Sequence, residues 1–176
     1  MNRRGSCASI ARQRGVFLIE ALVAILIFSL GILGMVAMGA TAVSAQSDAQ
    51  YRSDADAFAN AIVSQIALNV DRGTPTDTES TRAGKIHASL LEFGHQQTAT
   101  TTDCVFSGGA STRSEVTDWA AKITAAGTGL PGTGVPNLQI AIPDDPAKFN
   151  QIVVTICWKA PTDRALRKHM LISYVN

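Results

Sequence analysis

Residues 15–43 read GVFLIEALVAILIFSLGILGMVAMGATAV, an apolar run with a single charged residue, Glu20. As a helix rising 1.5 Å per residue, Val16 to Val43 would be ~42 Å long, more than the ~30 Å hydrocarbon core of a bilayer. A carboxylate inside such a span costs roughly 2.5 to 3.5 kcal/mol on insertion scales. The run therefore predicts a membrane-spanning helix in which Glu20 is a candidate functional residue.

Charge around this run predicts its orientation. Arg3, Arg4, Arg12 and Arg14 precede it with no acidic residue among them, so the positive-inside rule places residues 1–15 in the cytoplasm. The other 11 basic residues accompany 14 acidic ones, a balance that does not suggest a nucleic-acid partner.

The helix is expected to continue beyond the apolar run. Apolar residues recur at three- and four-residue steps through Ala55, Phe58, Ala59, Ile62, Ile66 and Val70. Arg72-Gly73-Thr74-Pro75 then supplies the Gly and Pro that usually end a helix. We therefore expect a membrane half over 16–45, an amphipathic half over 46–72 and a head domain over 73–176.

The N-terminal residues resemble the class III signal of type IV pilins and pseudopilins. Arg12-Gln13-Arg14-Gly15 is followed by Val16-Phe17-Leu18-Ile19-Glu20 and then by the long apolar run. The resemblance implies that residues 1–15 are a leader removed by a prepilin peptidase, which cuts between Gly15 and Val16 and N-methylates Val16. It also implies that Glu20 acts in filament assembly. Val16 stands where this family more often has Phe, and Ala37 where major pilins often have Pro.

The rest of the chain predicts an α+β fold. Ile86, Leu90, Leu91 and Phe93 indicate a short helix, Thr98–Phe106 reads as a strand or an extended loop, and Ser107–Ala110 as a turn. Thr112-Arg113-Ser114-Glu115 is typical of a capping box that starts a further helix. Three strands are then expected, over Leu138–Ile142, Gln151–Lys159 and His169–Val175, as an antiparallel meander packed on the amphipathic half of the first helix.

This arrangement is the one that the pilin resemblance implies. Asp118-Trp119, the LPGTG stretch at 130–134 and the strand sequence QIVVTICW are similar to the minor pilins of the PilV group. That likeness implies a subunit of a type IV pilus, with roles in pilus assembly, twitching motility or adhesion. Its partners would be prepilin peptidase, other pilins contacted through the N-terminal helix, and the inner membrane before assembly, with the head first in the periplasm and then on the cell surface.

Cysteine positions agree with this topology. Cys7 lies in the leader, whereas Cys104 and Cys157 both lie on the oxidising side of the membrane, where a disulfide persists. A disulfide between Cys104 and Cys157 is therefore expected. Metal binding by the pair is the weaker interpretation, because no CxxC motif or nearby His completes a ligand set.

No catalytic motif is recognised, and neither an enzyme nor a cofactor is expected. The three histidines are scattered, no GxSxG elbow occurs, and the basic residues Arg164, Arg167, Lys168 and His169 are interpreted as a solvated loop. Two other functions stay open. One is a minor pseudopilin of a type II secretion system; the other is an ordinary exported or single-pass binding protein, for which Val43-Ser44-Ala45 resembles a cleavage site after an unusually long apolar region.

Overall fold

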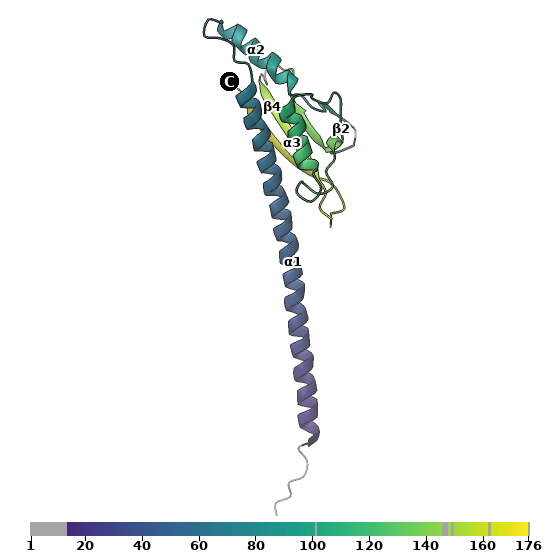
Figure 1. Cartoon of the computed structure of the whole chain (residues 1–176). Helices are drawn as coiled ribbons and strands as arrows, with labels where there is room; N and C mark the ends of the chain where they lie inside the picture. Colours follow the sequence, from purple (N-terminus) through teal and green to yellow (C-terminus); the bar gives the residue numbers. More distant parts are fainter. Residues whose placement is uncertain (1–13, 101, 146–147, 149, 162, 176) are drawn as a thin grey trace, which may run out of the picture. The chain divides into compact units, whose positions relative to one another are not determined.

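The computed structural model describes residues 14–100, 102–145, 148, 150–161 and 163–175. Its helices are α1 (Arg14–Asn69), α2 (Glu79–Glu92), α3 (Ser114–Thr124) and the 3₁₀ turn η1 (Val135–Asn137) (Figure 1). Its strands are β1 (Thr98–Ala99), β2 (Phe106–Ser107), β3 (Leu138–Ala141), β4 (Gln151–Trp158) and β5 (Arg167–Tyr174). This is the predicted α+β fold, a long N-terminal helix and a small antiparallel sheet, and its layout is consistent with that of a pilin. The chain divides into two compact units, with the boundary between Ser47 and Asp48.

The larger sheet is the predicted antiparallel meander. Its order is β3-β4-β5, with Leu138 opposite Ile156 and Val154 opposite Leu171. Seven of the eight residues of the central strand β4 are buried, whereas burial alternates along β5, which forms an edge of the sheet. A continuous β-branched run such as QIVVTICW suits a strand that is covered on both faces.

The second half of α1 supplies one side of the hydrophobic core. Its residues Ala55, Ala59, Ile62 and Ile66, and Val70 directly after its end, are at most 6% exposed and belong to the same cluster as the inward side chains of the sheet. Their three- and four-residue spacing places them on one face of the helix. The amphipathic pattern in the sequence therefore predicted the buried face correctly, except that Phe58 is only partly buried at its margin.

The predicted start of α3 is wrong. Thr112 was expected to be the N-cap, but the cap position is held by Arg113, whose side chain makes no capping hydrogen bond. The hydroxyl of Ser111 instead accepts a hydrogen bond from the backbone N–H of Arg113. The guanidinium of Arg113 lies over the ring of Phe93 and pairs with Glu92 and Glu115, so tertiary contacts fix this turn.

Two further expectations need correction. Thr98–Phe106 is neither one strand nor a plain loop, because β1 and β2 pair as a short antiparallel hairpin, and Ser107 belongs to β2 instead of a turn. Arg167, Lys168 and His169 lie in β5 and not in a solvated loop. Arg167 pairs with Asp48 of α1 and with Asp163, and His169 lies 3.4 Å from Asp56 of α1. These contacts connect the edge strand β5 to α1.

His95 is a buried titratable group at the turn between α2 and β1. It is 4% exposed, its backbone N–H and carbonyl both bond to Ile140 of β3, and its Nδ1 accepts a hydrogen bond from the N–H of Ser111. Burial lowers the pKa of the imidazole below its ordinary value of 6.5. The folded chain therefore holds His95 in its neutral form.

This burial predicts that the head loses stability in mild acid. Below about pH 6.5 the unfolded chain binds a proton at His95 that the folded chain excludes, so the free energy of unfolding falls as the pH drops toward the lower folded pKa. We expect thermal unfolding to occur at a lower temperature at about pH 5.5 than at about pH 7.5. His95→Asn, which keeps an acceptor close to the position of Nδ1, should reduce this difference; an unchanged pH dependence would contradict the assignment.

Candidate functional site

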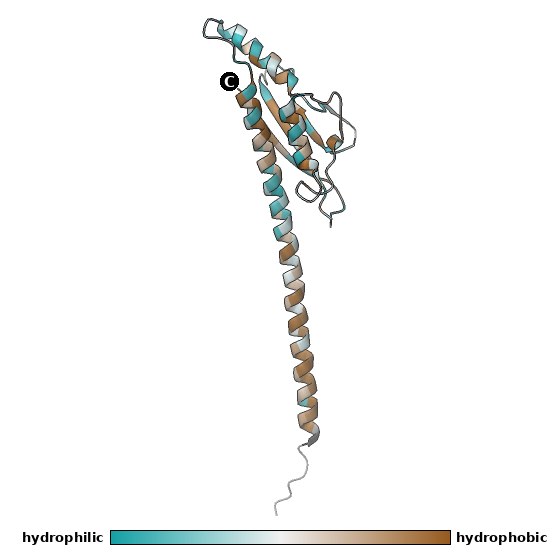
Figure 2. Cartoon of the chain, in the orientation of Figure 1, coloured by the Kyte–Doolittle hydropathy of each residue, from teal (hydrophilic) through white to brown (hydrophobic). Residues whose placement is uncertain are grey.

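The candidate site is the first half of α1, which carries the predicted processing and assembly residues. From Val16 to Ser47 no described side chain is buried, and Phe17, Phe28 and Met38 are 69 to 78% exposed. Figure 2 shows this half of the helix as mostly hydrophobic, ahead of a hydrophilic zone further along. The helix is long and apolar enough to cross a membrane, with a mean hydropathy of 2.8 in its most apolar window. Such a surface needs a lipid or protein neighbour, because each Å² of it left in water costs about 25 cal/mol.

Glu20 lies one turn after Val16 on this exposed helix. On a helix, the surface neighbours of position 20 are positions 16, 17, 23 and 24, and all four are apolar here. Glu20 makes no hydrogen bond or ion pair with any residue that the structure describes. Its carboxylate is therefore free to contact water, a lipid headgroup or another chain.

Packing within the described residues does not require glycine at the three glycine positions of the exposed half. A Cβ built on Gly31, Gly34 or Gly39 would meet nothing within 4 Å. Glycine inside a helix costs roughly 0.5 to 1 kcal/mol relative to alanine, and the chain's own contacts do not offset that cost. These positions leave room for a neighbouring helix to approach closely.

The predicted site residues fall into two groups. Gly15, Val16 and Glu20 all lie on α1, so the bond predicted to be cleaved, between Gly15 and Val16, is within a helix. The rest of the leader, including Cys7, lies outside the described residues. Cys104 and Cys157 form the predicted disulfide, with Cα atoms 5.8 Å apart, and both sulfurs are in the interior of the head.

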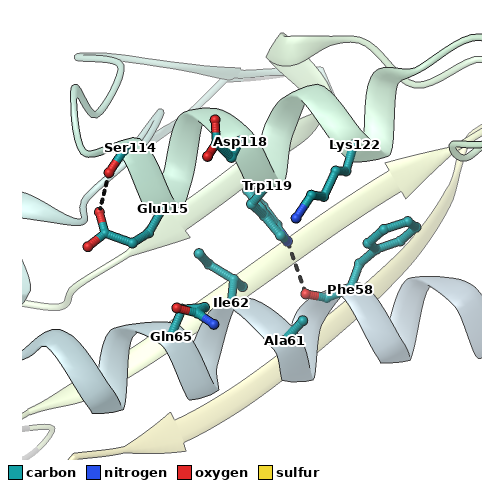
Figure 3. A pocket seen from close by; sticks show the side chains of 9 residues that line it. All are labelled: Phe58, Ala61, Ile62, Gln65, Ser114, Glu115, Asp118, Trp119 and Lys122. Carbon is teal, nitrogen blue, oxygen red and sulfur yellow. Dashed lines mark hydrogen bonds between the residues drawn. The ribbon is translucent and has the colours of Figure 1, made fainter.

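The head also contains a cleft that the sequence did not indicate. It lies between α1 and α3 and has a volume of about 370 Å³. Figure 3 shows Trp119 donating a hydrogen bond from its indole to the carbonyl of Phe58 across the floor, with a Nε1 to O distance of 3.0 Å. The charged rim residues are Glu115, Asp118 and Lys122.

One carboxyl in this cleft, that of Glu115, has a shifted pKa. Glu115 is held by its own backbone N–H, by Arg113 and by Ser114, which together lower the pKa of its carboxyl. A general acid at neutral pH needs a raised pKa instead. The hydroxyl of Ser114, which also lines the cleft, bonds to the carboxyl of Glu115, and no histidine lines the cleft. In the described part of the chain no three His, Cys, Asp or Glu side chains are grouped to hold a metal ion.

Comparison with known proteins adds no identification. No family model matches the chain, and neither a curated protein nor a solved structure is significantly similar to it.

Proposed function

We propose that this chain is a minor pilin of the PilV group, a subunit made as a precursor and inserted into a type IV pilus. The observation that carries the proposal is a helix whose first half, Val16 to Ser47, exposes apolar side chains on all sides with one unpaired carboxylate, Glu20. Its second half is covered by a folded head. A chain of this kind has one half suited to the inside of a bilayer or a helical bundle and one half suited to water.

The two halves of α1 suggest the route that the chain would take from the cytoplasm to the pilus. The arginines before Gly15 hold the N-terminus in the cytoplasm while α1 spans the inner membrane and the head folds in the periplasm, where the Cys104–Cys157 disulfide is stable. Prepilin peptidase would cut between Gly15 and Val16 and methylate the new amine. The anchor could then leave the membrane by exchanging lipid neighbours for the α1 helices of other pilins.

Glu20 would set the axial position that the helix takes among its neighbours in this exchange. After cleavage, Val16 carries a positive amine one turn before Glu20, and in a stack of parallel helices the carboxylate of one subunit can meet the amine of the next. Two charges that are each costly alone in an apolar core offset much of that cost when paired. A misplaced subunit leaves both charges unpaired, so the pair favours one axial position of the helix.

The mature N-terminus tests the proposal directly. We expect mass spectrometry of the protein from its native host to find a chain that begins at Val16 and carries one added methyl group on its amine. A chain that begins at Gln46, after the alternative cleavage site, would identify an ordinary exported protein. An intact Met1 would identify a single-pass anchor, and either result would overturn the proposal.

Replacement of Gly15 should block processing. In Gly15→Leu a bulky side chain stands beside the scissile bond, so we expect the uncleaved precursor to accumulate in the membrane. Gly31→Leu is the matched control, because position 31 is open on all sides and lies far along the helix from the bond. Gel mobility and intact mass distinguish precursor from mature chain, and normal cleavage of Gly15→Leu would contradict the assigned boundary.

A further inference from the structure

Residues 96–100 and 102–110, here called the strap, lie between α2 and α3. Hydrogen bonds hold the two ends of the strap close together. The flanking residues His95 and Ser111 are 4% and 8% exposed, and the N–H of Ser111 donates to Nδ1 of His95 at 3.3 Å. The N–H of Gln96 bonds to the carbonyl of Gly109, and His95 bonds to Ile140 of β3 through both backbone groups, each at 2.9 or 3.0 Å. Compact loops with closed ends of this kind can move without displacing the elements that flank them.

The strap contributes little to the buried core. Cys104 is its one buried described residue, whereas Val105 and Phe106 are half-buried. Polar groups supply its hydrogen bonds and ion pair to the rest of the head. These are hydrogen bonds from Asn137 Nδ2 to the carbonyl of Cys104 (2.8 Å), from Gln139 Nε2 to the carbonyl of Gln96 (3.1 Å) and from the N–H of Ile142 to Oε1 of Gln97 (3.2 Å), and an exposed pair of Lys168 with Asp103. Such bonds exchange for bonds to water at small net cost.

Cys104 has a backbone conformation that is unusual for a residue other than glycine. Its φ of 62° lies in the left-handed region, which is unfavourable for a residue that has a Cβ atom. Residues persist there when their surroundings fix them. Here the disulfide to Cys157 is the covalent constraint, so breaking it would leave Cys104 free to return to an extended conformation.

The strap lies on the face of the sheet opposite to the core, since Cys104 bonds to Cys157 and the carbonyl of Gln96 bonds to Gln139 there. Gln139 and Thr155 are cross-strand partners on β3 and β4, and Cys157 follows two residues after Thr155, so the three side chains share one face. They are 8%, 4% and 0% exposed. The core residues Leu138, Val154 and Ile156 alternate with them and point to the opposite face, toward α1.

We propose that the Cys104–Cys157 disulfide is a redox-dependent fastening of the strap. When the bond is present, the strap is closed over Gln139, Thr155 and Cys157. When a dithiol supplies two electrons and two protons, the bond becomes two thiols, the dithiol becomes a disulfide, and the strap opens while α1, α3 and the sheet stay folded. Oxidation of the two thiols then closes the strap after the core has folded. This proposal does not depend on the proposed function.

Hydrogen exchange on the full chain in detergent micelles tests this proposal. The background carries Cys7→Ser, so that Cys104 and Cys157 are the only cysteines, and two open forms are compared with the oxidised chain: the chain treated with dithiothreitol, and the variant with Cys104→Ser and Cys157→Ala. In both open forms we expect amides of residues 96–110 to exchange at least about tenfold faster. Amides in residues 55–70, 116–123 and 152–156 should change by less than about twofold.

A destabilised chain with an intact disulfide is the matched control. Val154→Ala opens a cavity on the core face and should raise exchange throughout the core while the strap stays protected relative to the reduced chain. Unchanged exchange at 96–110 in both open forms would overturn the proposal, because the hydrogen bonds alone would then hold the strap. Loss of protection across the core in both open forms would overturn it as well, since the disulfide would then be required for the fold itself.

Discussion

A Glu20→Ala variant is expected to be cleaved after Gly15 like the parent chain and yet to be absent from filaments. The carboxylate is one turn past the Gly15–Val16 bond, so its removal leaves intact the residues before Val16 that the proposed peptidase would recognise. Removal does take away the partner that the proposed function assigns to the amine of a neighbouring subunit. Leaving that amine unpaired in an apolar core should cost several kcal/mol, enough to reduce incorporation by at least about a hundredfold.

The measurement compares the variant chain in the membrane fraction with that in sheared pili by immunoblotting. Glu20→Gln is the informative companion, because it keeps the size and polarity of the side chain and removes only its charge. We expect Glu20→Gln to resemble Glu20→Ala, whereas Ser29→Ala, a change on the same exposed helix, should assemble normally. Normal incorporation of both Glu20 variants would refute the assigned role of the carboxylate.

Ile66→Ala is expected to lower the free energy of unfolding of the head by about 2 to 5 kcal/mol. Ile66 is fully buried on the face of α1 that packs against the sheet, and truncation would leave a cavity among side chains that the helix and sheet hold in place. Stabilities of small domains are about 5 to 15 kcal/mol, so this one change removes a large share. Denaturation in detergent micelles, followed by the fluorescence of the buried Trp119 and Trp158, measures the loss.

Leu68→Ala is the matched control for Ile66→Ala. Leu68 lies two residues further along the same helix, loses a side chain of similar size, and is 77% exposed. We expect a change within about 0.5 kcal/mol, as for most surface substitutions. Equal effects at the two positions would show that the head does not pack on the face of α1 described above.

The sequence predicted most of the fold because its patterns are local. Three- and four-residue spacing located the buried face of α1. A β-branched run located β4, and alternation located β3 and β5, each to within two residues at either end. The LIE triplet, Gly15 and the preceding arginines directed attention to Glu20 without any structure. These features depend on residues that are near neighbours in the chain, so periodicity and composition reveal them.

Other features were invisible in the sequence because they join distant residues. The cap of α3 depends on Ser111 and on an Arg113 guanidinium that lies over Phe93, 20 positions earlier. The basic residues of β5 were misread as a loop because their acidic partners, Asp48 and Asp56, are more than 100 residues away on α1. The cleft beside Trp119 has no local pattern at all.

The sequence by itself determined an apolar N-terminal helix with one carboxylate, a second half of that helix with one buried face, an α+β head and a pair of cysteines able to form a disulfide. The tertiary structure alone decided how the segment between α2 and α3 lies. It joins the ends of the strap through His95 and Ser111, places Cys104 in a left-handed conformation and sets the strap across the face of the sheet opposite to the core. Hydrophobic periodicity specifies which surfaces are buried, whereas a loop with few apolar residues takes its position from long-range polar contacts and a covalent bond.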